Sequence, residues 1–190
     1  VGAPIGRIIC ATNRNDVVHR TISVGDMSMG GNLQTVSPAM DIQFAYNLER
    51  VMYFCSGADS TLVRAVMTQL EATRAVVVPP PLLAAMQRIF LSCAVGDDET
   101  MSTMRDVYEQ SGYLLDPHSA VGVHALDHVP AVAAAVKDAA ATVCVLTAHP
   151  AKFDEVVLRA GLTPQKVPRV EALKALRLSF SWLRNPKGVS

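Results

Sequence analysis

The chain has 190 residues, of which 50% are hydrophobic, 18% charged and only 5% aromatic. That composition is typical of a globular protein with helices packed on a buried sheet, and it argues against an all-β sandwich. Lysine plus arginine equals aspartate plus glutamate, 17 each, so the chain lacks the basic surplus that nucleic-acid binding normally needs.

The first predicted element is a buried parallel strand at residues 7–11, with the sequence R-I-I-C-A. The apolar run ends at the polar residues 12–16, and open α/β sheets place ligands at this end of their strands. Small and turn-forming residues dominate the stretch from Thr21 to Pro38, so we expect a long loop there.

A helix is predicted to begin at Ser37 and to run to about Tyr53. Serine is a favoured N-cap residue, and Pro38 would occupy the first helical position, where its missing N–H costs nothing. A second helix is predicted from about Asp59 to Arg74, because its apolar residues recur at the spacing of one helical face.

The three prolines at 79–81 should end that region and open a third helix over residues 82–93. A fourth helix is predicted over residues 98–110. It should end at Gly112, since glycine adopts the left-handed conformation that commonly closes a helix.

The last third of the chain holds the second predicted strand. Asp116 is expected to cap a helix that has Pro117 at its first position. Residues 142–146, T-V-C-V-L, form a short apolar run that indicates a buried strand. Further helices are predicted over residues 130–139, 151–160 and 170–178. Two strands among many helices predict a helix-rich α/β fold with few parallel strands.

Four segments, in this order, resemble the threonine synthase family. They are A-T-N-R-N-D at 11–16, S-P-A-M-D-I at 37–42, D-P-H-S-A-V-G at 116–122 and L-T-A-H-P-A-K-F at 146–153. Each motif is weak alone, but together they extend the resemblance over residues 5–157. The family uses pyridoxal phosphate on a fold related to the tryptophan synthase β subunit, and it converts O-phosphohomoserine and water to threonine and phosphate.

The resemblance implies how the chain is divided. Residues 1–35 would be a remnant of the small domain and a connecting loop. Residues 36–190 would be the C-terminal part of the large, three-layer α/β/α domain that binds the cofactor. The N-terminal half of the same protein would then be the main partner of this chain.

The resemblance also implies that the cofactor's lysine lies outside this chain. Family members carry the Schiff-base lysine in a motif resembling S-F-K-D and a phosphate loop resembling G-N-F-G, and neither sequence occurs here. None of the lysines present stands in that motif: Lys137, Lys152, Lys166, Lys174 and Lys187. We therefore expect no catalytic residue in this chain, no activity from it alone and no pyridoxal phosphate bound by it alone.

The residue expected to contact the cofactor is Thr147, which by resemblance hydrogen-bonds the pyridine nitrogen. The alternative is that Thr147 caps the helix that begins near Pro150. Residues expected to orient the phosphorylated substrate are Asn13, Asn15, Asp16, Ser37 and Asp41. Asparagine and aspartate are also ordinary turn formers, and a serine can simply cap a helix, so both interpretations stay open for these five.

Histidine titrates near neutral pH, but His118 and His149 stand beside prolines at helix starts, which favours structural roles. No Cys or His spacing is typical of a metal site, and the four cysteines indicate reduced, buried thiols in a cytoplasmic protein. No apolar run is long enough to span a membrane. Two alternatives to a threonine synthase remain: a related phospho-lyase that releases phosphate without making threonine, and a non-catalytic binding module with the same fold.

Overall fold

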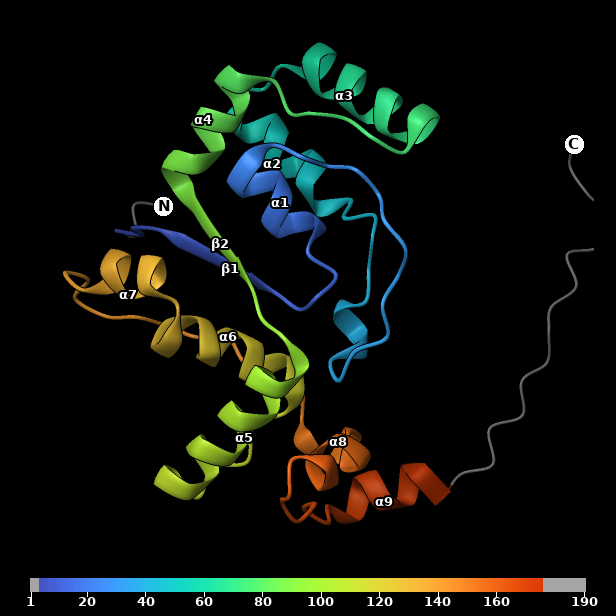
Figure 1. Ribbon diagram of the computed structural model, residues 1–190, viewed down its shortest axis with the longest axis vertical. Coiled ribbons are helices and arrows are strands. Elements are labelled where there is room, and N and C mark those ends of the chain that lie inside the picture. The colour runs from blue at the N-terminus through green and yellow to red at the C-terminus, as the bar shows by residue number, and fades with distance from the viewer. Residues whose placement is uncertain (1–3, 176–190) are drawn as a thin grey trace, which may run out of the picture.

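The computed structural model describes residues 4–175, apart from the side chains of 172–175. Its described strands are β1 (Ile8–Thr12) and β2 (Phe90–Ala94), which pair in parallel from Ile8↔Phe90 to Thr12↔Ala94. The two strands lie between helix α1 (Val17–Val24) and helix α6 (Pro117–His128), which pack against them from opposite sides (Figure 1). The predicted class, a helix-rich α/β fold with few parallel strands, is confirmed.

Helices make up most of the remaining described structure, in two groups. The upper group in Figure 1 contains α2, α3 and α4, and the lower group contains α5, α8 and α9, with α7 beside the strands. The bounds are α2 Asn47–Cys55, α3 Ser60–Thr73, α4 Pro80–Ile89, α5 Asp97–Ser111, α7 Pro130–Val136, α8 Asp154–Arg159 and α9 Pro168–Ala175, with short 3₁₀ helices η1 at Pro38–Met40 and η2 at Pro150–Lys152. The proposed domain boundary between residues 35 and 36 stays a prediction.

Each helix group has its own apolar core. Met52 and Met86 are fully buried in the upper core, which α1 also joins. Met104 and Val157 are fully buried in the lower core, where α5 and α8 meet. A third, small cluster at the strands includes Val121 of α6. The strand ends and the start of α6 therefore lie between two separately packed bodies.

Several predicted helix ends are confirmed. Asp59 caps α3 by accepting hydrogen bonds from the backbone N–H groups of Thr61 and Leu62. Gly112 ends α5 with a φ of 70°, in the left-handed region that only glycine enters at low cost. Asp116 caps α6, with Pro117 in its first turn, as predicted.

The predicted helix over residues 82–93 is wrong in its last four residues. Helix α4 begins at Pro80 and ends at Ile89, and residues 90–94 form strand β2 instead. The apolar run F-L-S-C-A is compatible with either structure, and pairing with β1 decides for the strand. Sequence periodicity alone gave no indication of that partner, which lies some eighty residues upstream.

The predicted strand over residues 142–146 is also wrong in the described structure. This segment has no regular secondary structure, and its Val143 and Val145 side chains are 82% and 75% exposed. A strand needs a neighbouring backbone to pair with, and within residues 4–175 no backbone partner lies alongside this one. Cys144 faces the other way, toward Gly122 of α6.

The predicted helix from Ser37 to Tyr53 is wrong as far as residue 46 and correct after it. Only the 3₁₀ turn η1 forms at its start, the chain continues without regular structure, and α2 begins at Asn47. Ser37 makes no capping hydrogen bond, because its hydroxyl contacts Asn13 instead.

Smaller differences concern two other segments. Helix α1 occupies the start of the predicted loop at 21–38, so the loop itself covers residues 25–37. The predicted helix over 151–160 is split at Phe153 into η2 and α8. The last predicted helix is observed as α9, and its expected residues 176–178 lie outside the described part of the chain.

No single helix within the described residues is long and apolar enough to cross a membrane. Within that described part, one pair of helices, α6 and α7, meets the requirement of length and composition when taken together, and the pair is bent by 76° at the break between them.

Replacing Gly25 by alanine should destabilise the upper core by about 1–2 kcal/mol, because both conformation and space oppose a side chain there. Gly25 ends α1 with a φ of 79°, and an added Cβ would lie 3.1 Å from Leu83 Cδ2. Gly31→Ala is the matched control, since nothing lies within 4 Å of its added Cβ. Urea unfolding of both variants measures the effect, and equal midpoints would contradict it.

Candidate functional site

The candidate site is built at the carboxyl ends of the two parallel strands. Asn13 follows β1 directly and is 1% exposed. Its Nδ2 donates toward Thr35 Oγ1 at 2.7 Å, Asp41 Oδ1 at 2.8 Å and Ser37 Oγ at 3.0 Å. Its Oδ1 accepts from the backbone N–H of Asn15 at 2.9 Å, which closes a tight turn. Asn13 therefore ties the loop that holds Thr35, Ser37 and Asp41 to the strand end.

Asn15 holds a second part of the same loop. Its amide donates to Leu33 O and to Asp41 Oδ1, both at 2.9 Å, and its Oδ1 accepts from Leu33 N–H at 2.9 Å. Gln43 Nε2 also donates to that oxygen, at 3.1 Å. All the hydrogen-bonding capacity of the buried Asn15 side chain is thus used inside the protein.

Asp41 is the acceptor on which these contacts converge. Its Oδ1 accepts from Asn13, Asn15 and the Thr35 hydroxyl, the last at 2.6 Å. Its Oδ2 accepts from Thr35 N–H at 3.1 Å. Charge-assisted hydrogen bonds of this kind are about twice as strong as neutral ones, which compensates for partly burying a carboxylate.

Asp16 is the one predicted substrate residue that lies apart from this cluster. Its Oδ1 accepts from Arg20 Nε at 2.9 Å, one turn along α1. Arg20 also pairs with Asp26 and donates to Ser28 O at 2.7 Å, which anchors the chain after α1. The structure thus brings Asn13, Asn15, Ser37 and Asp41 together and leaves Asp16 outside the group.

A second polar cluster lies at the start of α6, in the motif D-P-H-S. The buried Asp116 carboxylate accepts from the backbone N–H groups of His118 and Ser119, and also from the His118 ring and the Ser119 hydroxyl. Burial raises the pKa of Asp116, but hydrogen bonds from His118 and Ser119 outweigh it, so the pKa lies below its usual value. Asp116 is therefore ionised at neutral pH and needs these donors.

His118 and Ser119 each connect Asp116 to one of the two predicted site segments. His118 Nε2 accepts from the backbone N–H of Ala39 in η1, at 3.1 Å. Ser119 Oγ accepts from the backbone N–H of Thr147, at 3.3 Å. The start of α6 thus connects η1, which adjoins the first cluster, with Thr147, which is predicted to contact the cofactor.

The Thr147 side chain is exposed, and its hydroxyl has no hydrogen-bond partner among the described residues. The alternative role, capping the helix near Pro150, is filled by His149, whose Nδ1 accepts from Ala151 N–H at 3.1 Å. A free, neutral hydroxyl on a backbone held by Ser119 fits the ring nitrogen of pyridoxal phosphate as a hydrogen-bonding partner.

None of the lysine side chains that the structure describes forms a hydrogen bond or ion pair with either cluster. Lys137, Lys152 and Lys166 are exposed, and the Lys152 amine lies 5.7 Å from the centre of the Phe153 ring. No group of three or more metal-binding side chains is found in the portion of the chain that the structure describes.

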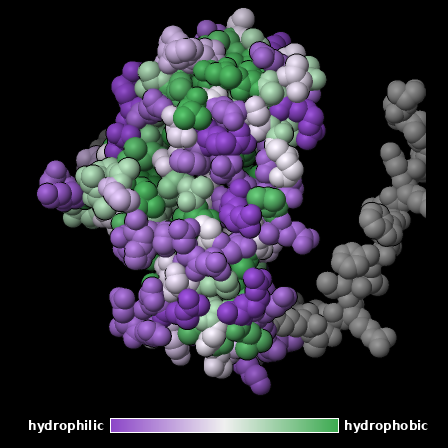
Figure 2. Space-filling view, in the orientation of Figure 1, coloured by the Kyte–Doolittle hydropathy of each residue, from purple (hydrophilic) through white to green (hydrophobic). Residues whose placement is uncertain are grey.

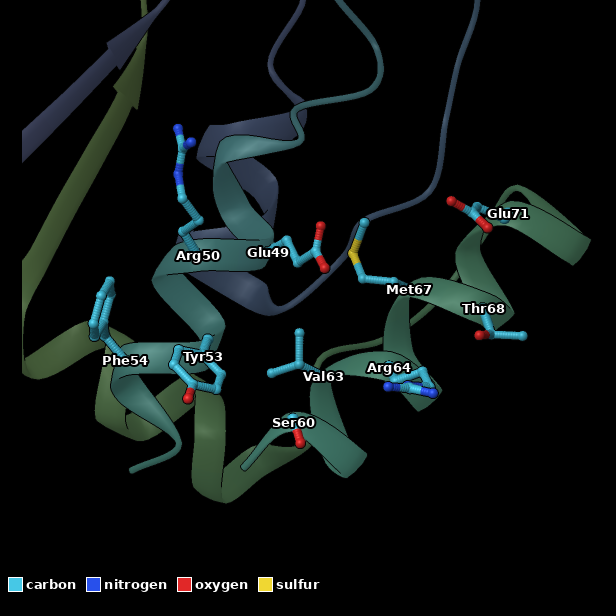
Figure 3. Close-up of a pocket in the computed structure, with 10 residues that line it drawn as sticks. All are labelled: Glu49, Arg50, Tyr53, Phe54, Ser60, Val63, Arg64, Met67, Thr68 and Glu71. Carbon is cyan, nitrogen blue, oxygen red and sulfur yellow. The ribbon is translucent and has the colours of Figure 1, made fainter. Parts of the chain in front are cut away.

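Two surface pockets lie elsewhere, one in the upper helix group and one where α1 and α2 meet the strands. The larger, about 560 Å³, lies between α2 and α3, with Val63 and Met67 at its floor and Glu49, Arg50 and Arg64 around it (Figure 3). The other, about 410 Å³, is largely apolar and includes Cys10 and Phe44. Hydrophobic side chains also gather on this upper part of the surface (Figure 2). None of the predicted site residues lines either pocket.

Sequence reasoning missed two residues of the first cluster. Thr35 and Gln43 carry no motif signal, because any hydroxyl or amide in a loop has the same appearance in a sequence. Ser119 and its neighbour His118 do stand in the quoted D-P-H-S motif, and their connecting role could have been suspected from it.

Comparisons with known proteins agree with the motifs. A family model described as threonine synthase, C-terminal, matches residues 119–187. The chain is 39% identical over 175 residues to human threonine synthase-like 2 and 35% identical over 168 residues to the threonine synthase of Pseudomonas aeruginosa. These matches take in 92% and 85% of this chain, but only 35% and 34% of the relatives.

Solved structures give the same result. A threonine synthase from Brucella melitensis with pyridoxal phosphate bound superimposes with a TM-score of 0.80 at 36% identity, over 95% of this chain and 38% of that one. The yeast threonine synthase superimposes with a TM-score of 0.79 at 27% identity, over 93% of this chain and 38% of that one. The chain thus corresponds to little more than a third of each of these enzymes.

Proposed function

Because the chain belongs to the threonine synthase family, we propose that it forms part of a pyridoxal-phosphate enzyme converting O-phosphohomoserine and water to threonine and phosphate. The observation that carries this proposal is the exposed Thr147 hydroxyl, which has no hydrogen-bond partner among the described residues and stands on a backbone fixed by Ser119. The N-terminal half of the protein would supply the cofactor's lysine and its phosphate cradle. This chain alone would be inactive and would contribute no catalytic residue.

Thr147 is the proposed cofactor contact of this chain. When bound, pyridoxal phosphate withdraws electrons from the carbon skeleton of the substrate so that phosphate can leave and water can add. A threonine hydroxyl, unlike a carboxylate, carries no charge and so does not stabilise a proton on the ring nitrogen. Its part would be to hold the ring in place without changing its charge.

The clustered residues Asn13, Asn15, Ser37 and Asp41 are proposed to serve the substrate side, together with the neighbouring Asp16. Support comes from their position at the carboxyl end of the parallel strands, where α/β proteins bind ligands. Since Asn15 is saturated by internal hydrogen bonds, its contribution would be to fix the shape of the surrounding loop. Asp16 would act through the segment that Arg20 anchors.

A second candidate is a phospho-lyase that releases phosphate from a related substrate without making threonine. It is favoured by the higher identity to threonine synthase-like 2 proteins, 39% for the human protein against 35% for the Pseudomonas enzyme. Incubating the whole protein with O-phosphohomoserine and measuring both products separates the two. Equal amounts of phosphate and threonine support the synthase, whereas phosphate without threonine supports the lyase.

We also propose that the protein is cytoplasmic, as the four cysteines suggested. The four cysteines are free, but only Cys93 is buried as expected, whereas Cys10, Cys55 and Cys144 are half-buried. Loss of solvent contact raises the pKa of each thiol. Thiols of this kind are poorly reactive and persist in a reducing compartment.

The proposal is tested by Thr147→Val in the whole protein that carries this chain. Loss of one hydrogen bond should weaken pyridoxal-phosphate binding by about three- to tenfold and shift the absorbance of the bound cofactor. Thr147→Ser should restore both. Thr142→Val, an exposed position in the same segment, is the matched control. If Thr147→Val keeps the affinity, the spectrum and the rate, the pyridine-nitrogen assignment is wrong.

A further inference from the structure

An unbroken series of hydrogen bonds connects η1 to Thr147 through the start of α6. Ala39 N–H donates to His118 Nε2, the His118 ring bonds Asp116 Oδ1, the Ser119 hydroxyl bonds Asp116 Oδ2, and Thr147 N–H donates to Ser119 Oγ. Apart from the two backbone donors, every group in this series belongs to three residues of one helix end. Asp116 and Ser119 are 1% and 2% exposed, so water does not compete for the bonds that the Asp116 carboxylate accepts from the His118 ring and the Ser119 hydroxyl.

The direction of each bond follows from the chemistry of its two ends. Because His118 Nε2 accepts a hydrogen bond from a backbone N–H, the ring hydrogen is on Nδ1 and is donated to Asp116 Oδ1 at 2.9 Å. The Ser119 hydroxyl has one proton, and donating it to Asp116 leaves a lone pair directed to Thr147 N–H. Both connections therefore depend on the same ionised carboxylate.

The His118 ring is also held from the side. Phe153, just beyond η2, packs against it with ring centres 4.7 Å apart at an angle of 53°. That contact limits rotation of the ring about its own axis, so that Nε2 stays directed at Ala39. His118 thus has one orientation in which both of its nitrogens are bonded.

From this geometry we propose that Ser119 and His118 are positioning residues for the two sides of the active site. Ser119 fixes the position of the Thr147 backbone, and with it the position of the hydroxyl proposed to contact the cofactor. His118 fixes the position of η1, which adjoins the substrate-side residues Ser37 and Asp41. Asp116 couples the two. This inference rests on the proposed cofactor role of Thr147.

The Ser119 half of the proposal is tested in the whole protein with Ser119→Ala. We expect about three- to tenfold weaker pyridoxal-phosphate binding, a shifted cofactor absorbance and faster hydrogen exchange at Thr147 N–H in the cofactor-free protein. Ser119→Thr keeps the hydroxyl and should restore all three. If Ser119→Ala does not fold, Ser119→Cys keeps the side-chain size but bonds weakly and should show the same losses. Unchanged exchange and absorbance in the folded variant would overturn the assignment.

The His118 half is tested by a pair of amide variants. His118→Gln can place an oxygen near the Nε2 position and keep Ala39 N–H bonded, whereas His118→Asn reaches only to the Nδ1 position and keeps Asp116 bonded. We expect His118→Asn, but not His118→Gln, to speed hydrogen exchange at Ala39 and to raise KM for the substrate by about three- to tenfold with kcat little changed. His128→Asn, an exposed position on the same helix, is the control. Equal exchange at Ala39 in both amide variants would refute the His118 role.

The outcomes also separate this inference from the proposed function. If Thr147→Val changes the cofactor spectrum while Ser119→Ala does not, the positioning role fails and the cofactor contact stands. If Ser119→Ala speeds exchange at Thr147 but neither variant changes the spectrum, the cofactor contact fails and with it the functional meaning of the positioning.

Discussion

Replacing Asn13 by aspartate should lower the free energy of unfolding by about 3 kcal/mol or more at neutral pH. The change keeps the shape of the side chain but turns the donor Nδ2 into an acceptor. That atom now faces Asp41 Oδ1 at 2.8 Å and the oxygens of Thr35 and Ser37 at 2.7 and 3.0 Å. Two carboxylates would then meet in a partly buried site with their former donor gone.

The destabilisation of Asn13→Asp should shrink as the pH falls toward about 4, because protonating one of the two carboxyls removes the repulsion and supplies a donor. Asn47→Asp is the matched control, since Asn47 is exposed in the first turn of α2, where a negative charge is favourable. Urea unfolding at pH 7 and at pH 5 measures both variants. Equal stabilities of the two variants at pH 7 would show that the cluster does not hold the loop as its contacts indicate.

The location of this cluster could be predicted from the sequence, but its contacts could not. An apolar strand that ends in Asn13 and Asn15 predicts polar side chains at a ligand-binding edge, and the structure places them there. That Asp41 would be their acceptor depends on how the loop of residues 25–37 folds back. Such a return is fixed by tertiary contacts, which leave no periodic signal in the sequence.

The strand predictions also show that tertiary contacts cannot be predicted from local sequence. Residues 90–94 and 142–146 are both short apolar runs, and only the first has a backbone beside it in the described structure. Apolar composition indicates that a segment can form a strand, whereas pairing decides whether it does. Local signals were more dependable: Gly112 ends a helix and Asp116 begins one where their chemistry predicts, although the predicted cap at Ser37 does not form.

Replacing Asp116 by alanine should cost about 3–4 kcal/mol, well above the typical value of about 1 kcal/mol for a lost helix cap. Asp59→Ala is the matched control, because Asp59 accepts the same two kinds of backbone bond at the start of α3. The difference between the variants then reports the bonds that Asp116 has in addition, from the His118 ring and the Ser119 hydroxyl.

The cost of Asp116→Ala should depend on pH in a direction that follows from the Asp116 carboxyl. Hydrogen bonds from His118 and Ser119 outweigh the effect of burial and lower its folded-state pKa below the ordinary value of 3.8. A lowered pKa stabilises the fold above the unfolded-state value, and that contribution is lost as the pH falls through the folded-state pKa. The contribution of the Asp116 carboxylate to the stability gap between the wild type and Asp116→Ala should therefore be complete above about pH 5 and should shrink below about pH 4. Denaturant unfolding at pH 7 and pH 3 measures it, and a gap of the same size at both values would mean that the ionised carboxylate is not what holds Thr147 and η1 to α6.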